Sequence, residues 1–126
     1  MASNKLGGVR LLLLEDEILI AMDVEQLCLD EGAAAVITCR NLDEARNAEG
    51  GYDAAVLDVM ADGEVTLPFA ADLRARDIPF IFASGYAERD DIRDGFPEIR
   101  VVNKPYSGND LVEALAAAIA AASRGG

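Results

Sequence analysis

The chain has 126 residues and a mass of 13.4 kDa, enough for one compact domain with a single hydrophobic core. Its net charge of −12 argues against nucleic acid as a direct partner, because phosphate backbones require clustered Lys and Arg. The chain has no histidine, and Cys28 and Cys39 lack metal-ligand spacing, so neither zinc nor histidine-based catalysis is expected.

The two cysteines are expected to be buried, reduced thiols. The apolar run 11–14 is cut off by three acidic residues, so it is neither a signal peptide nor a membrane span. A cytoplasmic location is therefore predicted.

The first part of the chain reads as a lead-in, a strand and a helix. Residues 1–8 are expected to form a flexible lead-in. The run 9–14 is short and apolar except for Arg10, which is typical of a strand buried on both faces of a parallel sheet. A helix ending near Gly32 follows, because apolar side chains recur on one helix face, at Ile20, Val24 and Leu27.

The middle of the chain alternates in the same way. A weaker strand is expected at 34–38, followed by a helix that Asn41 can cap and that Gly50-Gly51 ends. The next strand, 54–59, is wholly apolar except for Asp58. A looser stretch containing Asp62-Gly63 then leads to a helix over 68–76.

The last part of the chain completes the alternation. Strands are predicted at 79–83 and 100–102, with a short, weakly anchored helix at 88–96 between them. Ser107 or Asn109 caps a final alanine-rich helix, and residues 123–126 form a tail. Five strand–helix units of this kind predict an α/β domain, 9–122, with a parallel sheet covered on both faces.

Polar residues fall where the predicted strands end. Functional groups in such sheets gather at the carboxyl ends of the strands, so these side chains are expected to converge on one rim. The residues are Glu15, Asp16, Asp58, Ser84 and Lys104.

This set of residues has a coherent chemistry. Three carboxylates in one cleft repel one another unless a cation joins them, and Mg²⁺ prefers oxygen ligands. A carboxylate such as Asp58 can attack phosphorus and form an aspartyl phosphate. Lys104 can then neutralise charge on the transferring group, while the Ser84 hydroxyl donates to a phosphoryl oxygen.

Four segments in this order resemble the response-regulator receiver family over residues 9–122. They are Leu-Leu-Leu-Leu-Glu-Asp-Glu, Ala-Val-Leu-Asp-Val, Phe-Ala-Ser-Gly-Tyr and Asn-Lys-Pro-Tyr. The resemblance implies a flavodoxin-like (βα)5 doubly wound sheet with strand order 2-1-3-4-5. It also implies a role for each matching residue: Asp58 as phosphoacceptor, Glu15 and Asp16 as the metal pair, the Met60 carbonyl as a further metal ligand, Ser84 and Lys104 as phosphate contacts, and a cis bond before Pro105.

One position departs from the family pattern. Many receivers carry an aromatic residue three positions before the lysine, where this chain has Val101. The Phe-Ala-Ser-Gly-Tyr segment resembles a subclass with a Phe-Ala-Thr-Gly signature and a nearby tyrosine. Tyr86 is the candidate substitute that would work with Ser84 as a switch, the alternative being that it is a packing residue.

The final helix is apolar nearly all round. Such helices tend to be covered on more than one side, although alanine is also simply a good helix former. The outward Ala116, Ala117 and Ala120 are therefore predicted to meet a partner or a second copy in a homodimer.

The leading hypothesis is a two-component receiver, single-domain or part of a larger protein. A histidine kinase or phosphotransfer protein would phosphorylate Asp58 with Mg²⁺ present, and the change would switch contacts with a downstream protein. No enzymatic activity beyond self-phosphorylation and autodephosphorylation is expected. Two alternatives are a Mg²⁺-dependent phosphatase, which would usually carry an aspartate where this chain has Met60, and a receiver-like binding module that needs no phosphorylation.

Overall fold

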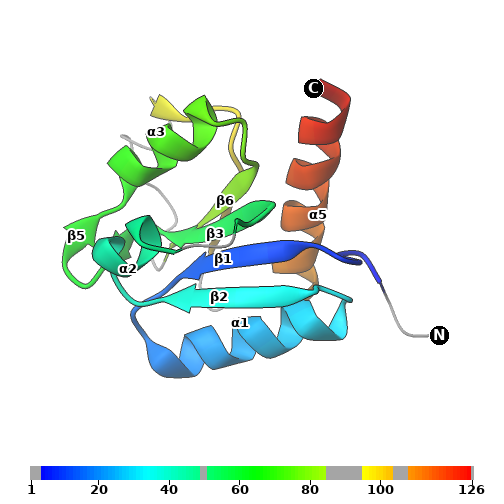
Figure 1. The fold of residues 1–126 in the computed structure, drawn as a ribbon, viewed down its shortest axis with the longest axis horizontal. Coiled ribbons are helices and arrows are strands. Elements are labelled where there is room, and N and C mark those ends of the chain that lie inside the picture. The colour runs from blue at the N-terminus through cyan, green and yellow to red at the C-terminus, as the bar shows by residue number, and fades with distance from the viewer. Residues whose placement is uncertain (1–3, 49–50, 85–94, 104–107, 126) are drawn as a thin grey trace.

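A computed structural model describes residues 4–48, 51–84, 95–103 and 108–125 (Figure 1). Five parallel strands form one sheet in the order β2-β1-β3-β6-β7. The strands are β1 (Arg10–Leu14), β2 (Ala35–Cys39), β3 (Ala54–Asp58), β6 (Phe80–Ser84) and β7 (Val101–Asn103). With the short strands β4 and β5 set aside, this is the predicted flavodoxin-like order 2-1-3-4-5.

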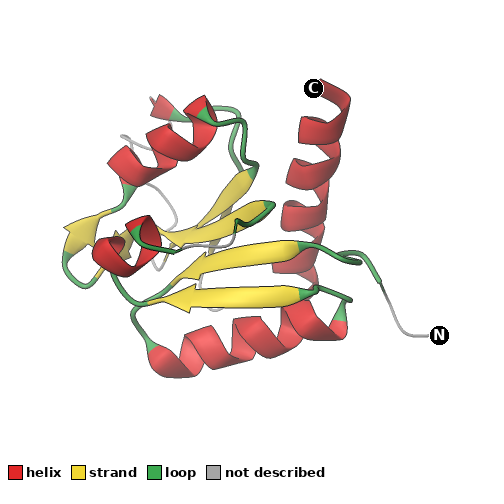
Figure 2. Ribbon diagram, in the orientation of Figure 1, coloured by secondary structure: helices red, strands yellow, loops and turns green. Residues whose placement is uncertain are grey.

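Helices cover both faces of the sheet (Figure 2). The described helices are α1 (Ile18–Asp30), α2 (Leu42–Arg46), α3 (Leu67–Ala75) and α5 (Gly108–Gly125). The side chain of Asn41 caps α2 as predicted, accepting a hydrogen bond of 2.9 Å from the Glu44 amide. Most of the helix predicted at 88–96 lies outside the described residues.

The core consists of two layers, one on each side of the sheet. Alternate residues of β1 face opposite layers, as the two-residue period of a strand requires. Leu11 and Leu13 pack with α1 and α5, whereas Leu12 and Leu14 pack with α2 and α3. Because both faces are covered, the carboxyl ends of the strands are left as the place where polar side chains can gather.

Residues 1–8 were expected to be a flexible lead-in. The described part of this segment, residues 4–8, is instead packed against the domain. Leu6 is fully buried in the core layer of α1 and α5. Its amide donates to the Glu31 carbonyl at 2.9 Å, and the Gly8 amide donates to Gly32 at 3.0 Å. A single leucine among small and polar residues has no periodicity, so the pattern gave no signal of an anchor.

The looser stretch after β3 is in fact a β-hairpin. Strands β4 (Met60–Ala61) and β5 (Glu64–Val65) pair antiparallel. The two turn residues, Asp62 and Gly63, have positive φ angles of 52° and 78°. An Asp-Gly pair in this conformation is a preferred two-residue hairpin turn.

The outward face of α5 differs in part from the prediction. Ala120 is exposed as expected, but Ala116 packs against the core layer that contains α1. Ala117 is half-buried and lines a surface pocket with Ile78 and Phe80. Within the described parts of the chain, no helix is both long and apolar enough to cross a bilayer.

Candidate functional site

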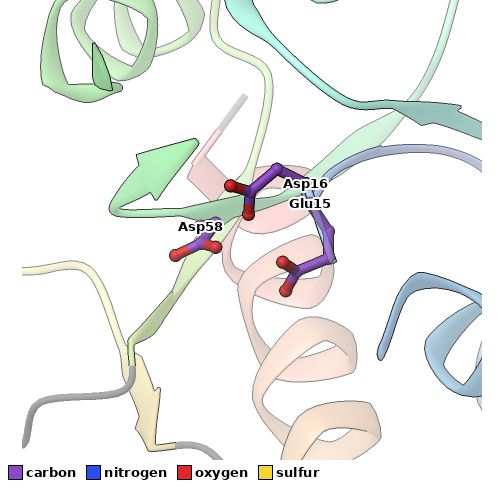
Figure 3. A group of neighbouring side chains, drawn as sticks. All are labelled: Glu15, Asp16 and Asp58. Atoms are coloured by element: carbon purple, nitrogen blue, oxygen red, sulfur yellow. The ribbon is translucent and has the colours of Figure 1, made fainter. Parts of the chain in front are cut away.

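Glu15, Asp16 and Asp58 meet at the carboxyl end of the sheet (Figure 3). Glu15 and Asp16 directly follow β1, and Asp58 is the last residue of β3. Strands β1 and β3 are neighbours in parallel register, with Leu14 opposite Leu57, so both strands deliver their next residues to the same place. Each of the three carboxylates offers an oxygen, and these atoms all lie within 4.8 Å of one another.

The three carboxylates differ in exposure. Glu15 is 1% exposed and Asp58 8% exposed, whereas Asp16 faces solvent. One oxygen of Glu15, Oε2, accepts a hydrogen bond of 3.1 Å from the Glu17 amide. Two enclosed acidic groups and one accessible one form a site that is open to solvent on one side.

The donor set fits a hard divalent cation. Three carboxylates this close repel one another unless a cation offsets their charge. All three ligand atoms are carboxylate oxygens, which suit Mg²⁺ rather than softer metals. The chain therefore has an acidic group that could bind a hard divalent cation, the class of ion to which Mg²⁺ belongs.

Met60 lies next to this group of carboxylates. Met60 is the first residue of β4. Its backbone amide donates a long hydrogen bond, of 3.4 Å, to Asp58 Oδ1. This position is consistent with the Met60 carbonyl being a metal ligand. That role stays a prediction.

Ser84 ends β6, the strand that adjoins β3. In the register of these strands, Ala83 is opposite Asp58, so the Ser84 backbone lies at the predicted rim. Ser84 is also opposite Asn103, the last residue of β7 and the one before Lys104. Lys104, Pro105 and Tyr86 lie outside the described residues, so their roles and that of the Ser84 hydroxyl stay predictions.

Two residues that the sequence did not single out contact the site. The Asp62 amide, at the hairpin turn, donates to Asp16 Oδ2 at 2.9 Å. The Thr66 hydroxyl, which is fully buried, donates to the Asp58 carbonyl at 2.6 Å. The Asp62-Gly63 pair could have indicated a hairpin, but no pattern in the sequence pointed to Thr66.

No protein-family model matches the sequence, and no curated protein matches it. Solved structures do match. A mutant of the anti-anti-sigma factor PhyR from Bartonella quintana superposes with a TM-score of 0.79 at 23% identity over 93% of this chain. The response regulator PhyR from Brucella abortus has a TM-score of 0.74 at 27% identity over 94% of this chain. The chain spans half the length of each of these two PhyR chains.

A putative response regulator from Chloroflexus aurantiacus matches along its own length. Its TM-score is 0.78 at 19% identity, covering 90% of this chain and 98% of that one. This is the receiver-domain fold. In this fold, the acidic group lies at the strand ends predicted from the sequence. The subclass with the Phe-Ala-Ser-Gly-Tyr segment is a finer assignment, which these similarities do not test.

Proposed function

We propose that the chain is a phosphoacceptor receiver domain of a two-component system. The observation that supports it most directly is the meeting of Glu15, Asp16 and Asp58 within 4.8 Å at the carboxyl end of a receiver-type sheet. The fold alone would not suffice, because one fold serves many functions and the site has to carry the assignment.

Asp58 is the proposed nucleophile. A carboxylate oxygen of Asp58 attacks the phosphorus of a phosphohistidine on a kinase or phosphotransfer protein, forming a P–O bond. The P–N bond to the donor imidazole breaks, and the imidazole keeps the electron pair and takes up a proton. Water later hydrolyses the aspartyl phosphate and regenerates Asp58.

The neighbouring residues are proposed to bind the metal ion and to contact the phosphoryl group during that reaction. When bound, Mg²⁺ would offset the negative charge on the transferring group. Glu15, Asp16 and Asp58 would hold the ion, with the Met60 carbonyl as a further candidate ligand. Ser84 and Lys104 are proposed to contact the phosphoryl oxygens, and Tyr86 to report the change.

The partners are proposed to be proteins on both sides of the reaction. These 126 residues contain no histidine, so the phosphohistidine must come from outside them. The PhyR from Bartonella quintana is an anti-anti-sigma factor, and output by contact with another protein is proposed here as well. The exposed apolar side chains of Ile18, Leu19 and Met22 begin α1 two residues after Asp16, where a protein donor would approach.

The proposal is tested by incubating the chain with acetyl phosphate, with and without Mg²⁺, and measuring its intact mass. We expect a gain of about 80 Da, one phosphoryl group, only with Mg²⁺. Asp58→Asn should abolish the gain. Asp72→Asn, an exposed aspartate of α3, is the matched control and should behave like the wild type.

Two results would count against this function. A wild-type chain that gains no mass with Mg²⁺ would favour a binding module that needs no phosphorylation. An adduct that survives in Asp58→Asn would place the acceptor elsewhere.

A further inference from the structure

We propose that the β4–β5 hairpin is a clamp on the acidic site, and that Thr66 is the positioning residue that closes it. This inference rests on the proposed function, since it concerns how the same site is held. Thr66 touches neither a metal ligand's side chain nor the reacting atoms in any contact described here. It acts through the backbone that carries Asp58 and Met60.

The hairpin is fastened at both ends to residues of the site. At its turn, the Asp62 amide donates to Asp16 Oδ2 at 2.9 Å. At its base, the Thr66 amide donates to the Val59 carbonyl at 2.9 Å, and the Thr66 hydroxyl lies 2.6 Å from the Asp58 carbonyl. The hairpin therefore links the acidic pair after β1 to the phosphoacceptor at the end of β3.

The orientation of the Thr66 hydroxyl is unusual for its position. Thr66 precedes α3 as its N-cap, where a threonine oxygen ordinarily accepts a hydrogen bond from an amide of the first helical turn. Here the side chain makes no such cap, and its hydroxyl is within hydrogen-bond distance of the Asp58 and Val59 carbonyls instead. A local rule broken in this way is expected mainly where a functional site gains from it.

The burial of Thr66 means that water cannot take over the hydrogen bond of its hydroxyl. The side chain is fully buried, so a lost hydroxyl cannot be replaced by bulk water at the Asp58 carbonyl. The chain directly after Asp58 would then be free to shift by small amounts. Outer residues that orient metal ligands commonly affect metal affinity by 10–100-fold, which is the order of effect expected here.

Three variants separate positioning from stability. Thr66→Val keeps the shape of the side chain and removes the hydroxyl, whereas Thr66→Ser keeps the hydroxyl. Gly63→Ala adds a methyl group that meets no atom within 4 Å, so it acts only by straining the turn at φ 78°. Thr38→Val is the matched control, because the Thr38 hydroxyl is exposed and bonds Glu25 on α1.

The test measures the Mg²⁺ dissociation constant by calorimetry well below the melting temperature, together with the phosphorylation rate from acetyl phosphate. We expect Thr66→Val to weaken Mg²⁺ binding about tenfold, with Gly63→Ala changing it in the same direction. Thr66→Ser and Thr38→Val should stay within about twofold of the wild type.

A purely structural role for Thr66 would give a different result. Melting temperatures would fall in Thr66→Val and Gly63→Ala while Mg²⁺ affinity stayed within about twofold of the wild type, and this would overturn the clamp. If Thr66→Val does not fold, Gly63→Ala alone decides by the same criterion. A wild-type chain that binds no Mg²⁺ would also overturn it.

The clamp and the proposed function can fail separately. A wild-type chain that binds Mg²⁺ but takes no phosphoryl group would reject the receiver function. The Mg²⁺ affinities of the variants would still decide the clamp.

Discussion

Asp58 is 8% exposed and ends a strand in which all five residues are buried. Burying a carboxylate among apolar residues costs free energy unless partners or a cation compensate. The nearby Glu15 and Asp16 raise that cost when all three are ionised. A divalent cation bound at this site would offset that cost, as the proposed phosphoacceptor role of Asp58 requires.

The two cysteines are buried titratable groups that, unlike Asp58, have no proposed reaction. Both are free and buried, as predicted. Burial, with a smaller effect from Glu31, raises the pKa of Cys28 from 9.0 to about 12. Burial, together with Glu44, raises the pKa of Cys39 to about 11. Their thiolates are therefore scarce at neutral pH, and these residues act as packing groups.

This predicts how the thiols respond to reagents and to pH. In the native chain neither cysteine should react with a thiol reagent at pH 8, whereas both should react in denaturant. Because both folded pKa values lie above 9.0, their contribution to stability is complete below pH 9 and is lost as pH rises toward 11–12. Rapid labelling of either thiol in the folded chain at pH 8 would show that this cysteine is accessible and not buried.

The N-terminal segment, residues 4–8, acts as part of the core. Lys5 forms an ion pair with Glu113 of α5, and Leu6 fills the layer between α1 and α5. The exposed ion pair contributes little, because both groups are solvated. Leu6 is the anchor, since its whole side chain is removed from water.

Leu6→Ala should therefore destabilise the domain by about 2–5 kcal/mol, the usual cost of truncating a buried leucine. Urea denaturation followed by far-ultraviolet circular dichroism measures it. Val65→Ala, at an exposed position of β5, is the control and should change the free energy of unfolding by less than about 0.5 kcal/mol. If Leu6→Ala matched that control, residues 4–8 would be a loose lead-in after all.

The elements differ in how far the sequence could predict them. Apolar runs such as 9–14 and 54–59 predicted buried strands, and the winding rule then predicted that Asp16 and Asp58 converge. The hairpin after β3 was missed because each of its strands has only two residues, too short for any periodicity. Thr66 was missed because its role depends on a backbone carbonyl, which no side-chain pattern reveals.

The whole molecule combines a strong negative net charge with exposed apolar side chains close to the site. The chain carries a net charge of −12, which favours a basic partner. Yet the first turns of α1, directly after the acidic pair, expose three large apolar side chains. An apolar surface beside an acidic site is expected to dock a protein donor and to be irrelevant to a small one.

Leu19→Glu tests this expectation, since Leu19 is 75% exposed. With a phosphohistidine protein that phosphorylates the wild type, transfer should slow about tenfold or more, as for loss of an interface anchor. The rate from acetyl phosphate should be unchanged. Leu29→Glu is the control, because Leu29 is 40% exposed on the same helix about 15 Å further along. Equal effects of the two variants would remove the first turns of α1 as the docking surface.

Asp58, held among Glu15 and Asp16, is the residue that we propose takes the phosphoryl group. The most direct measurement traps the phosphorylated chain with borohydride, which reduces an aspartyl phosphate to homoserine, and maps the product by peptide mass spectrometry. We expect homoserine at position 58, and only when Mg²⁺ was present during phosphorylation. Reduction at another carboxylate, or an equal yield at position 58 without a divalent cation, would contradict it.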